Sequence, residues 1–231
     1  MHTQGRFEEP IEHYSAALKI DPKLAQAHNN LGVVLLQQGR VAEGVAQLRE
    51  AVRLRPGDPE SEYNLGAALN QAERWDEAAG MLARLAQARP DDFKVRCQYG
   101  LALSHLQKTR EAMSHYAHAL LLQPDFTEAL DGLAWILATT PQPEYRNGVE
   151  AVHMAERACD LTGRKEGKPL LTLAASYAEA GRFQEAVSAA EQAQVAATKA
   201  GQKDVAAKCQ SLRTALQSGK PWRDVPQHGS E

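Results

Sequence analysis

The sequence predicts an all-α fold, a solenoid of stacked antiparallel helix pairs, and three observations predict it. Apolar residues make up 43% of the 231 residues but aromatic residues only 6%, and this alanine-rich and leucine-rich composition suits the packing of small side chains between helices. Prolines recur every 34 residues, and so do glycines between them. The recurring positions are Pro22, Pro56, Pro90 and Pro124, then Gly32, Gly66 and Gly100, with Ala134 in the next place. Repeats of this length bury their apolar faces by stacking on one another.

Each repeat is predicted to contain a first helix, a turn, a second helix and a closing proline. The first helix carries the recurring glycine, as in "NNLG" at 29–32 and "YNLG" at 63–66. Glycine inside a helix costs about 1 kcal/mol relative to alanine, so we expect a neighbouring helix to approach it closely. The second helix ends before the proline, which lacks an amide proton and whose ring collides with the preceding turn.

Further columns keep the same period and carry a family resemblance. They are Arg6, Arg40, Arg74 and Lys108, then Glu9, Glu43, Glu77 and Glu111, then Ala17, Ala51 and Ala119, with Leu85 as the exception. The second helices also share a small residue (Gly44, Ala78, Ala112) and, four residues later, a leucine or an aromatic residue (Leu48, Leu82, Tyr116). From about residue 5 to about residue 200 this pattern resembles the tetratricopeptide repeat. The resemblance implies a right-handed α-solenoid whose first helices line a concave surface.

The repeat register predicts the organisation of the whole chain. A partial leading repeat, with only a turn and a second helix, precedes five repeats, and the fourth carries a loop insertion near 139–148, where two prolines and an Asn-Gly pair occur. A capping helix closes the last apolar surface, and a flexible tail follows. The predicted boundaries are 1–24, 25–58, 59–92, 93–126, 127–163, 164–200, 201–218 and 219–231. The last repeats resemble the C-terminal ends of large bacterial tetratricopeptide repeat proteins.

Charge and composition argue against several classes of partner. The formal net charge is −3, and the basic residues do not gather into a stripe, so we expect no nucleic acid partner. The start of the chain has no apolar core of the kind a secretory signal needs, and no run is long enough for membrane insertion. We therefore expect a soluble chain, either cytoplasmic or the soluble part of a larger protein. The cysteines Cys97, Cys159 and Cys209 have no paired spacing and are expected to be buried, reduced thiols.

No motif predicts an active site. Nothing in the sequence resembles a nucleophile elbow, a glycine-rich phosphate loop or a pair of catalytic carboxylates. His115 and His118 are three residues apart on a predicted helix, but no further ligand occurs at a spacing that would complete a metal site. The sequence therefore predicts a non-catalytic protein without a cofactor or a metal ion.

A row of amide side chains is predicted on the concave surface. Asn30, Asn64 and Gln98 recur at the repeat interval, and a carboxamide can pair with both the C=O and the N–H of an extended peptide. The row resembles the asparagine ladder of O-linked N-acetylglucosamine transferase repeats, weakened at Gln98 and absent at Gly132. The alternative is that these amides form hydrogen bonds between repeats. The complete predicted surface comprises Asn29, Asn30, Gln37, Tyr63, Asn64, Gln71, Lys94, Gln98, Leu101, His105 and Trp135.

Two features of this surface leave alternatives open. Trp135 is the largest apolar group predicted on it, and is either an anchor for a peptide or a core residue. The carboxylate clamp that holds chaperone C-termini uses basic residues on this wall, whereas Val33, Asn64 and Gln98 are neutral here. The sequence therefore does not favour the capture of chaperone tails.

Three functions are compatible with this sequence. The first is a protein–protein interaction scaffold that binds an extended peptide or a partner helix in the concave groove. The second is the substrate-recognition or regulatory arm of a larger enzyme such as a glycosyltransferase. The third is a self-assembling module that forms a homo-oligomer through the unpaired N-terminal half repeat.

Overall fold

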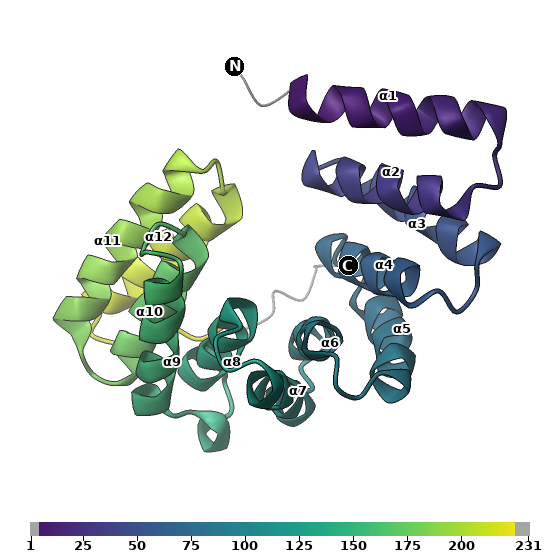
Figure 1. The fold of residues 1–231 in the computed structure, drawn as a ribbon. Coiled ribbons are helices and arrows are strands. Elements are labelled where there is room, and N and C mark those ends of the chain that lie inside the picture. Colours follow the sequence, from purple (N-terminus) through teal and green to yellow (C-terminus); the bar gives the residue numbers. More distant parts are fainter. Residues whose placement is uncertain (1–4, 225–231) are drawn as a thin grey trace, which may run out of the picture. The chain divides into compact units, whose positions relative to one another are not determined.

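The computed structural model describes residues 5–224 and confirms the all-α fold. Within this range the chain forms twelve α-helices and one short 3-10 segment, without a β-strand. The helices divide into two compact units, α1 to α6 and α7 to α12. In each unit consecutive helices pack against one another as an α-solenoid requires (Figure 1).

The first unit holds the partial repeat and two complete helix pairs, followed by one more first helix. Each helix packs on the next along the chain, and the first helices α2, α4 and α6 also contact one another in sequence. These three helices therefore form one continuous wall. The bounds are α1 (Gly5–Ile20), α2 (Ala25–Gln37), α3 (Val41–Leu54), α4 (Pro59–Gln71), α5 (Trp75–Ala88) and α6 (Phe93–His105).

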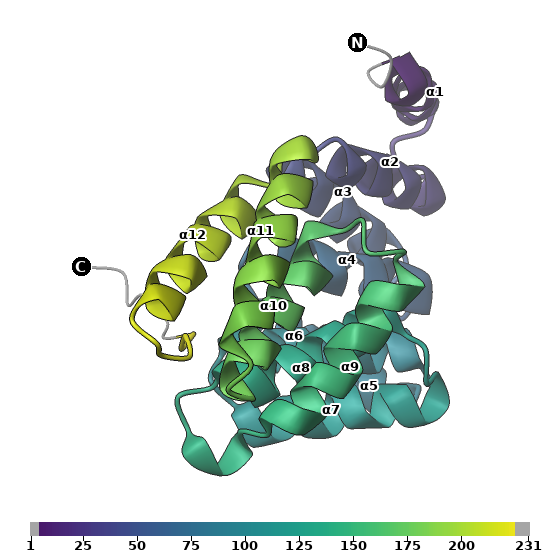
Figure 2. The ribbon, with the colours of Figure 1, turned by 90° about the vertical axis from the view of Figure 1, so that its left-hand side faces the viewer.

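The second unit contains the insertion and the cap. Helix α10 packs on α8, α9, α11 and α12, and Figure 2 shows α10, α11 and α12 side by side. The apolar stripe of α12 is buried, with Cys209, Leu212 and Leu216 at 6% exposure or less. The bounds are α7 (Thr109–Leu122), α8 (Thr127–Thr139), η1 (Pro143–Tyr145), α9 (Gly148–Leu161), α10 (Gly167–Glu179), α11 (Phe183–Lys199) and α12 (Lys203–Gln217).

The recurring glycines allow close helix packing, as the sequence predicts. A Cβ atom on Gly32 would lie 2.6 Å from Cγ of Leu48, and one on Gly66 would lie 2.7 Å from Cδ2 of Leu82. Both leucines are fully buried on the second helix of the same repeat. The closer packing of the two helices offsets the low helix propensity of glycine.

Local signals set the ends of the helices. Asp58 and Asp92 begin α4 and α6, where each carboxylate accepts a hydrogen bond from a backbone amide three residues later, at 2.9 and 3.2 Å. Such caps satisfy amides that have no partner within the helix. Gly39 follows α2 with a φ of +75°, the left-handed conformation that commonly ends a helix.

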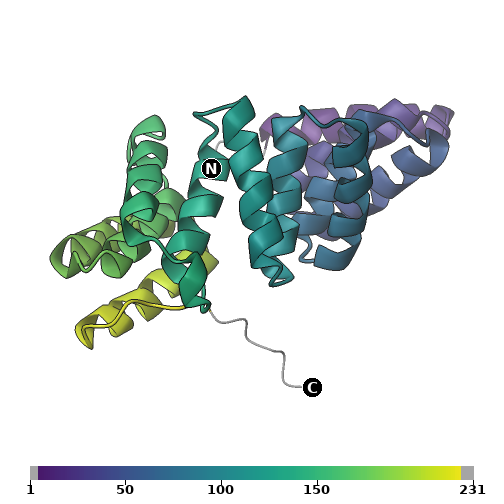
Figure 3. The ribbon, with the colours of Figure 1, turned by 90° about the horizontal axis from the view of Figure 1, so that it is seen from below.

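Residues 219–224, the described part of the predicted tail, lie against the second unit. The chain turns at Gly219, where φ is +67°, and returns to the end of α8, where the amide of Asp224 donates a hydrogen bond to the carbonyl oxygen of Thr139 at 3.0 Å. Figure 3 shows this segment running back along α12. Specific side-chain contacts hold residues 222–224, and residues 225–231 lie outside the described range.

No helix within residues 5–224 is long and apolar enough to cross a membrane.

Candidate functional site

The wall formed by α2, α4 and α6 carries most of the predicted surface. Asn30, Asn64 and Gln98 lie on consecutive first helices, and each is half-buried. Side chains of mixed character surround them. Gln37, Gln71, Lys94 and His105 are exposed, whereas Tyr63 and Leu101 are half-buried.

Asn29 lies beneath this wall rather than on it. Its side chain is only 1% exposed. Its Nδ2 donates to Oε1 of Glu60 at 3.4 Å, and its Oδ1 accepts a hydrogen bond from Nδ2 of Asn64 at 3.0 Å. Both partners belong to α4, so the amide of Asn29 joins two repeats. Direct contact between Asn29 and a ligand, which the repeat register predicts, is therefore not supported by its burial.

A second amide contact joins α4 to α6. Nδ2 of Asn70 donates to the backbone oxygen of Gln98 at 2.9 Å and to its side-chain Oε1 at 3.0 Å. Asn70 is 3% exposed. The repeat register places it on the first helix of its repeat, but no amide stands at the repeat interval before or after it, so it is not part of the recurring row. The alternative prediction, that the amides form hydrogen bonds between repeats, thus applies to Asn64 and Gln98 of the row.

Each amide of the row nevertheless uses only one end in these contacts. Asn30 accepts at Oδ1 from Gln26 at 3.1 Å and from Asn29 at 3.4 Å, Asn64 donates through Nδ2, and Gln98 accepts at Oε1. Among the described residues this leaves Nδ2 of Asn30, Oδ1 of Asn64 and Nε2 of Gln98 for solvent or a ligand. The wall therefore offers donors on α2 and α6 and an acceptor on α4.

The end of this wall is closed by a stacked pair of rings. His105, the last residue of α6, stacks on Trp75, the first residue of α5, with ring centroids 3.8 Å apart and an interplanar angle of 2°. His105 therefore forms the edge where the first-helix wall meets the second helix of the preceding repeat.

Trp135 occupies a different environment in the second unit. Its indole Nε1 donates to Oδ2 of Asp224 at 2.7 Å, and its ring lies against Trp222 with centroids 5.4 Å apart. Nζ of Lys208 lies 5.2 Å from the ring centroid. Trp135 is thus neither an open anchor nor a plain core residue, because the C-terminal tail covers it.

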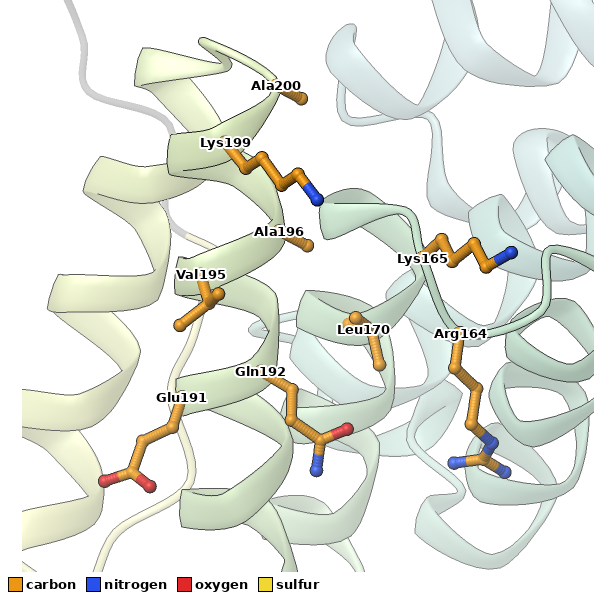
Figure 4. Close-up of a pocket in the computed structure, with 9 residues that line it drawn as sticks. All are labelled: Arg164, Lys165, Leu170, Glu191, Gln192, Val195, Ala196, Lys199 and Ala200. Atoms are coloured by element: carbon orange, nitrogen blue, oxygen red, sulfur yellow. The ribbon is translucent and has the colours of Figure 1, made fainter.

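A separate hollow of about 680 Å³ opens between α10 and α11 (Figure 4). Its lining combines the apolar side chains of Leu170, Val195 and Ala196 with the charged side chains of Arg164, Lys165, Lys199 and Glu191. Arg164 donates to Asp160 at 2.9 Å. Nothing in the repeat pattern predicts this hollow, because it depends on the loop between α9 and α10.

Metal ligands and thiols are two kinds of group that could carry chemistry in residues 5–224. This part of the chain contains no cluster of three or more histidine, cysteine, aspartate or glutamate residues able to hold a metal ion. The three cysteines are buried free thiols, as predicted. Burial raises the pKa of Cys159 to about 12, and it also raises the pKa of Cys209. Because a thiolate rather than a thiol is the nucleophile, burial makes Cys159 and Cys209 poor nucleophiles in the folded chain.

Comparisons with known proteins agree with the repeat register. Three family models match, described as TPR repeat for residues 2–39 and as tetratricopeptide repeat for residues 35–96 and 93–126. No curated protein sequence matches the chain significantly.

Solved structures extend the likeness over most of the chain. TTC0263 from Thermus thermophilus has a TM-score of 0.65 at 19% identity, covering 84% of this chain and 98% of that one. Yeast Tom70 has a TM-score of 0.63 at 17% identity, covering 91% of this chain and 43% of that one. YrrB, a TPR protein with an unusual peptide-binding site, has a TM-score of 0.55 at 24% identity, covering 69% of this chain and 79% of that one. At these identities the likeness shows the fold alone.

The three family models together span residues 2–126 of the 231. The matched residues contain α1 to α7, and beyond them α8 packs on α9 and α10 packs on α11. The chain therefore belongs to the tetratricopeptide repeat family.

Proposed function

We propose that this chain is a non-catalytic protein-interaction scaffold that binds an extended peptide along α2, α4 and α6. The observation that carries the proposal is the row formed by Asn30, Asn64 and Gln98, whose amides each use one end between or within repeats and keep the other end for a ligand. Backbone groups of an extended peptide are complementary to such a row, because they alternate between donors and acceptors.

The bonds between repeats prepare the row for binding. An amide that is already held at one end has lost much of its rotational freedom, so less entropy is lost when the other end meets a ligand. The ligand's own ordering then accounts for most of the entropic cost. The order of the free groups, donor then acceptor then donor, favours main-chain recognition over the recognition of one particular side chain.

The packing of the helices sets the length of the ligand. Packed helices lie about 8–10 Å apart, and an extended chain advances about 3.3 Å per residue. The three amides would therefore contact a peptide at about every third residue. Exposed Gln37, Gln71 and Lys94 are available for its side chains. YrrB, which shares the fold, is described as having a peptide-binding site, and this description supports the same class of ligand here.

Two isosteric changes test the proposal. Asn30→Asp combined with Gln98→Glu keeps the oxygens that accept from Gln26 and Asn70 but replaces both free donors with carboxylate oxygens. Proteins captured from a lysate by the unmodified chain would be identified, and their binding segments synthesised as labelled peptides. We expect fluorescence anisotropy to show at least tenfold weaker binding to the double variant, because each carboxylate would face a peptide carbonyl oxygen.

The matched control carries the same chemical change on second helices. Gln87 in α5 and Gln184 in α11 are exposed, so Gln87→Glu combined with Gln184→Glu alters the net charge equally but leaves the wall intact. Peptide affinity should be unchanged in this control. Equal affinities for the Asn30 and Gln98 variant and the unmodified chain would show that the row is structural only.

A further inference from the structure

The tail triplet, Trp222, Arg223 and Asp224, occupies a built site on the second unit. The ring of Trp222 lies 5.4 Å from that of Trp135, with an angle of 56° between the rings. Such tilted contacts between aromatic rings are favourable beyond the area that they bury. The indole N–H of Trp135, which would otherwise need water, donates to Oδ2 of Asp224 at 2.7 Å.

Arg223 of the triplet forms an ion pair with the carboxylate of Glu179. Nη2 of Arg223 lies 2.7 Å from Oε2 of Glu179, whose side chain is 14% exposed. Arg146, just before α9, approaches the other oxygen of Glu179 at 3.2 Å. Two arginines thus share one largely buried carboxylate. Partial burial strengthens such charge-assisted contacts, because water screens them less.

The end of α8 supplies the main-chain partners. The last carbonyl groups of a helix have no partner within it, and α8 runs into Pro141 without a glycine cap. Nη1 of Arg223 donates to the carbonyl oxygen of Ala138 at 3.2 Å, and the amide of Asp224 donates to that of Thr139 at 3.0 Å. A cation at this end is also favoured by the helix dipole.

A further cation completes the site from the capping helix. Nζ of Lys208, on α12, lies 3.9 Å from Oδ2 of Asp224 and 5.2 Å from the centroid of the Trp135 ring. The triplet seat is therefore formed by Trp135 and the carbonyl groups that end α8, by Glu179 of α10 and by Lys208 of α12. Every member of the triplet has a partner of matching chemistry in this seat.

The triplet has the features of a bound peptide that can leave. Residues 220–224 form no helix, and all three side chains of the triplet are only half-buried. A left-handed Gly219 and Pro221 connect them to α12, so release needs rotation in this short connection and not the opening of a helix pair. Segments with few buried contacts open at a small part of the global unfolding free energy.

We propose that the triplet seat is a peptide-recognition site for an extended segment with the order aromatic, arginine, aspartate, and that the chain's own tail occupies it in cis. The occupant in trans is a partner peptide that carries the same order of residues. A tethered tail has an effective concentration in the millimolar range, so a partner must displace it. The tail therefore raises the concentration of partner peptide that is needed to occupy the seat. This inference concerns the second unit and does not depend on the amide row of α2, α4 and α6.

The test uses the complete chain with the tail disabled. A labelled peptide with the sequence of residues 218–224, SGKPWRD, would be titrated into the unmodified chain and into the variants Trp222→Ala and Arg223→Glu. We expect at least tenfold tighter binding to each variant than to the unmodified chain, because the altered tail competes less well for the seat. The control peptide SGKPARD, which lacks the aromatic ring, should bind at least tenfold more weakly than SGKPWRD. Adding Glu179→Gln to either variant should weaken binding by a similar factor.

Several outcomes would overturn the proposal. Failure of SGKPWRD to bind either variant, with circular dichroism spectra unchanged, would make the tail a structural strap. Equal affinity for the unmodified chain and both variants would place the peptide elsewhere. Arg223→Glu retains the aromatic ring, so it decides the question if Trp222→Ala does not fold. Loss of the helical fold in both variants would show that the triplet is an integral part of the unit and not an exchangeable ligand.

Discussion

At the scale of single residues, the absence of a side chain has different consequences at different glycines. Gly32 and Gly80 are both in helices. A Cβ atom on Gly32 would meet Leu48 at 2.6 Å, whereas one on Gly80 would meet nothing within 4 Å. The repeat period identifies Gly32 as special, because Gly80 has no counterpart one repeat away. Only the packing shows the physical cause, which is a leucine on the partner helix.

These two glycines allow a matched prediction. We expect Gly32→Ala to lower the free energy of unfolding by about 1–2 kcal/mol, because overpacking costs about 1–3 kcal/mol and the better helix propensity of alanine returns only part of it. Gly80→Ala should raise that free energy by about 0.5–1 kcal/mol. Urea denaturation of both variants measures the difference. A stability gain at Gly32 equal to that at Gly80 would contradict the packing argument.

At the scale of elements, one turn position recurs with different residues. Gly39, Glu73 and Gln107 stand at the repeat interval in the turn between the first and second helices, with φ values of +75°, +57° and +59°. All three therefore adopt the left-handed conformation, although two of them carry a Cβ atom. A left-handed residue at this position ends the first helix of the pair, as it commonly does at helix C-termini.

Glu73 should therefore be strained relative to glycine. The left-handed conformation costs a residue with a Cβ atom about 1–2 kcal/mol. Glycine avoids this cost, but its greater freedom in the unfolded chain lowers the free energy of unfolding by about 0.5–1 kcal/mol. We expect Glu73→Gly to increase the free energy of unfolding by about 0.5–1 kcal/mol, and Gly39→Ala, the reverse change, to decrease it. The midpoints of urea denaturation check both signs. A decrease for Glu73→Gly would show that its side chain forms contacts worth more than the strain.

At the scale of the whole molecule, contacts between neighbours dominate. Within each of the two units, a helix packs mainly on the helices next to it along the chain or one repeat away. Stability in such an array is nearly a sum of local terms. The face of α1 formed by Ile11, Tyr14 and Ala17 is only half-buried, whereas the equivalent face of α3 is buried. A homo-oligomer through this half repeat stays a prediction.

The same locality predicts how a defect spreads. Leu212 of α12 is fully buried, and Leu212→Ala should cost about 2–5 kcal/mol locally. We expect amide hydrogen exchange to accelerate in α10, α11 and α12, while the helices of the first unit keep their rates. The unmodified chain, measured under the same conditions, is the reference. A uniform acceleration across all helices would show that the molecule unfolds as a single cooperative body.

The sequence by itself determined the period, the helix pairs, the close approach at Gly32 and Gly66, and the buried thiols. These depend on signals within one repeat, such as proline after a helix or glycine within it, and a recurring pattern makes them readable. Tertiary structure alone decided that Asn29 lies beneath the wall while Asn30 keeps a free donor. It also decided that Trp135 meets Asp224, 89 residues away. Such contacts depend on which side chains the folded backbone brings together, and no pattern within one repeat indicates a contact between residues so far apart in the sequence.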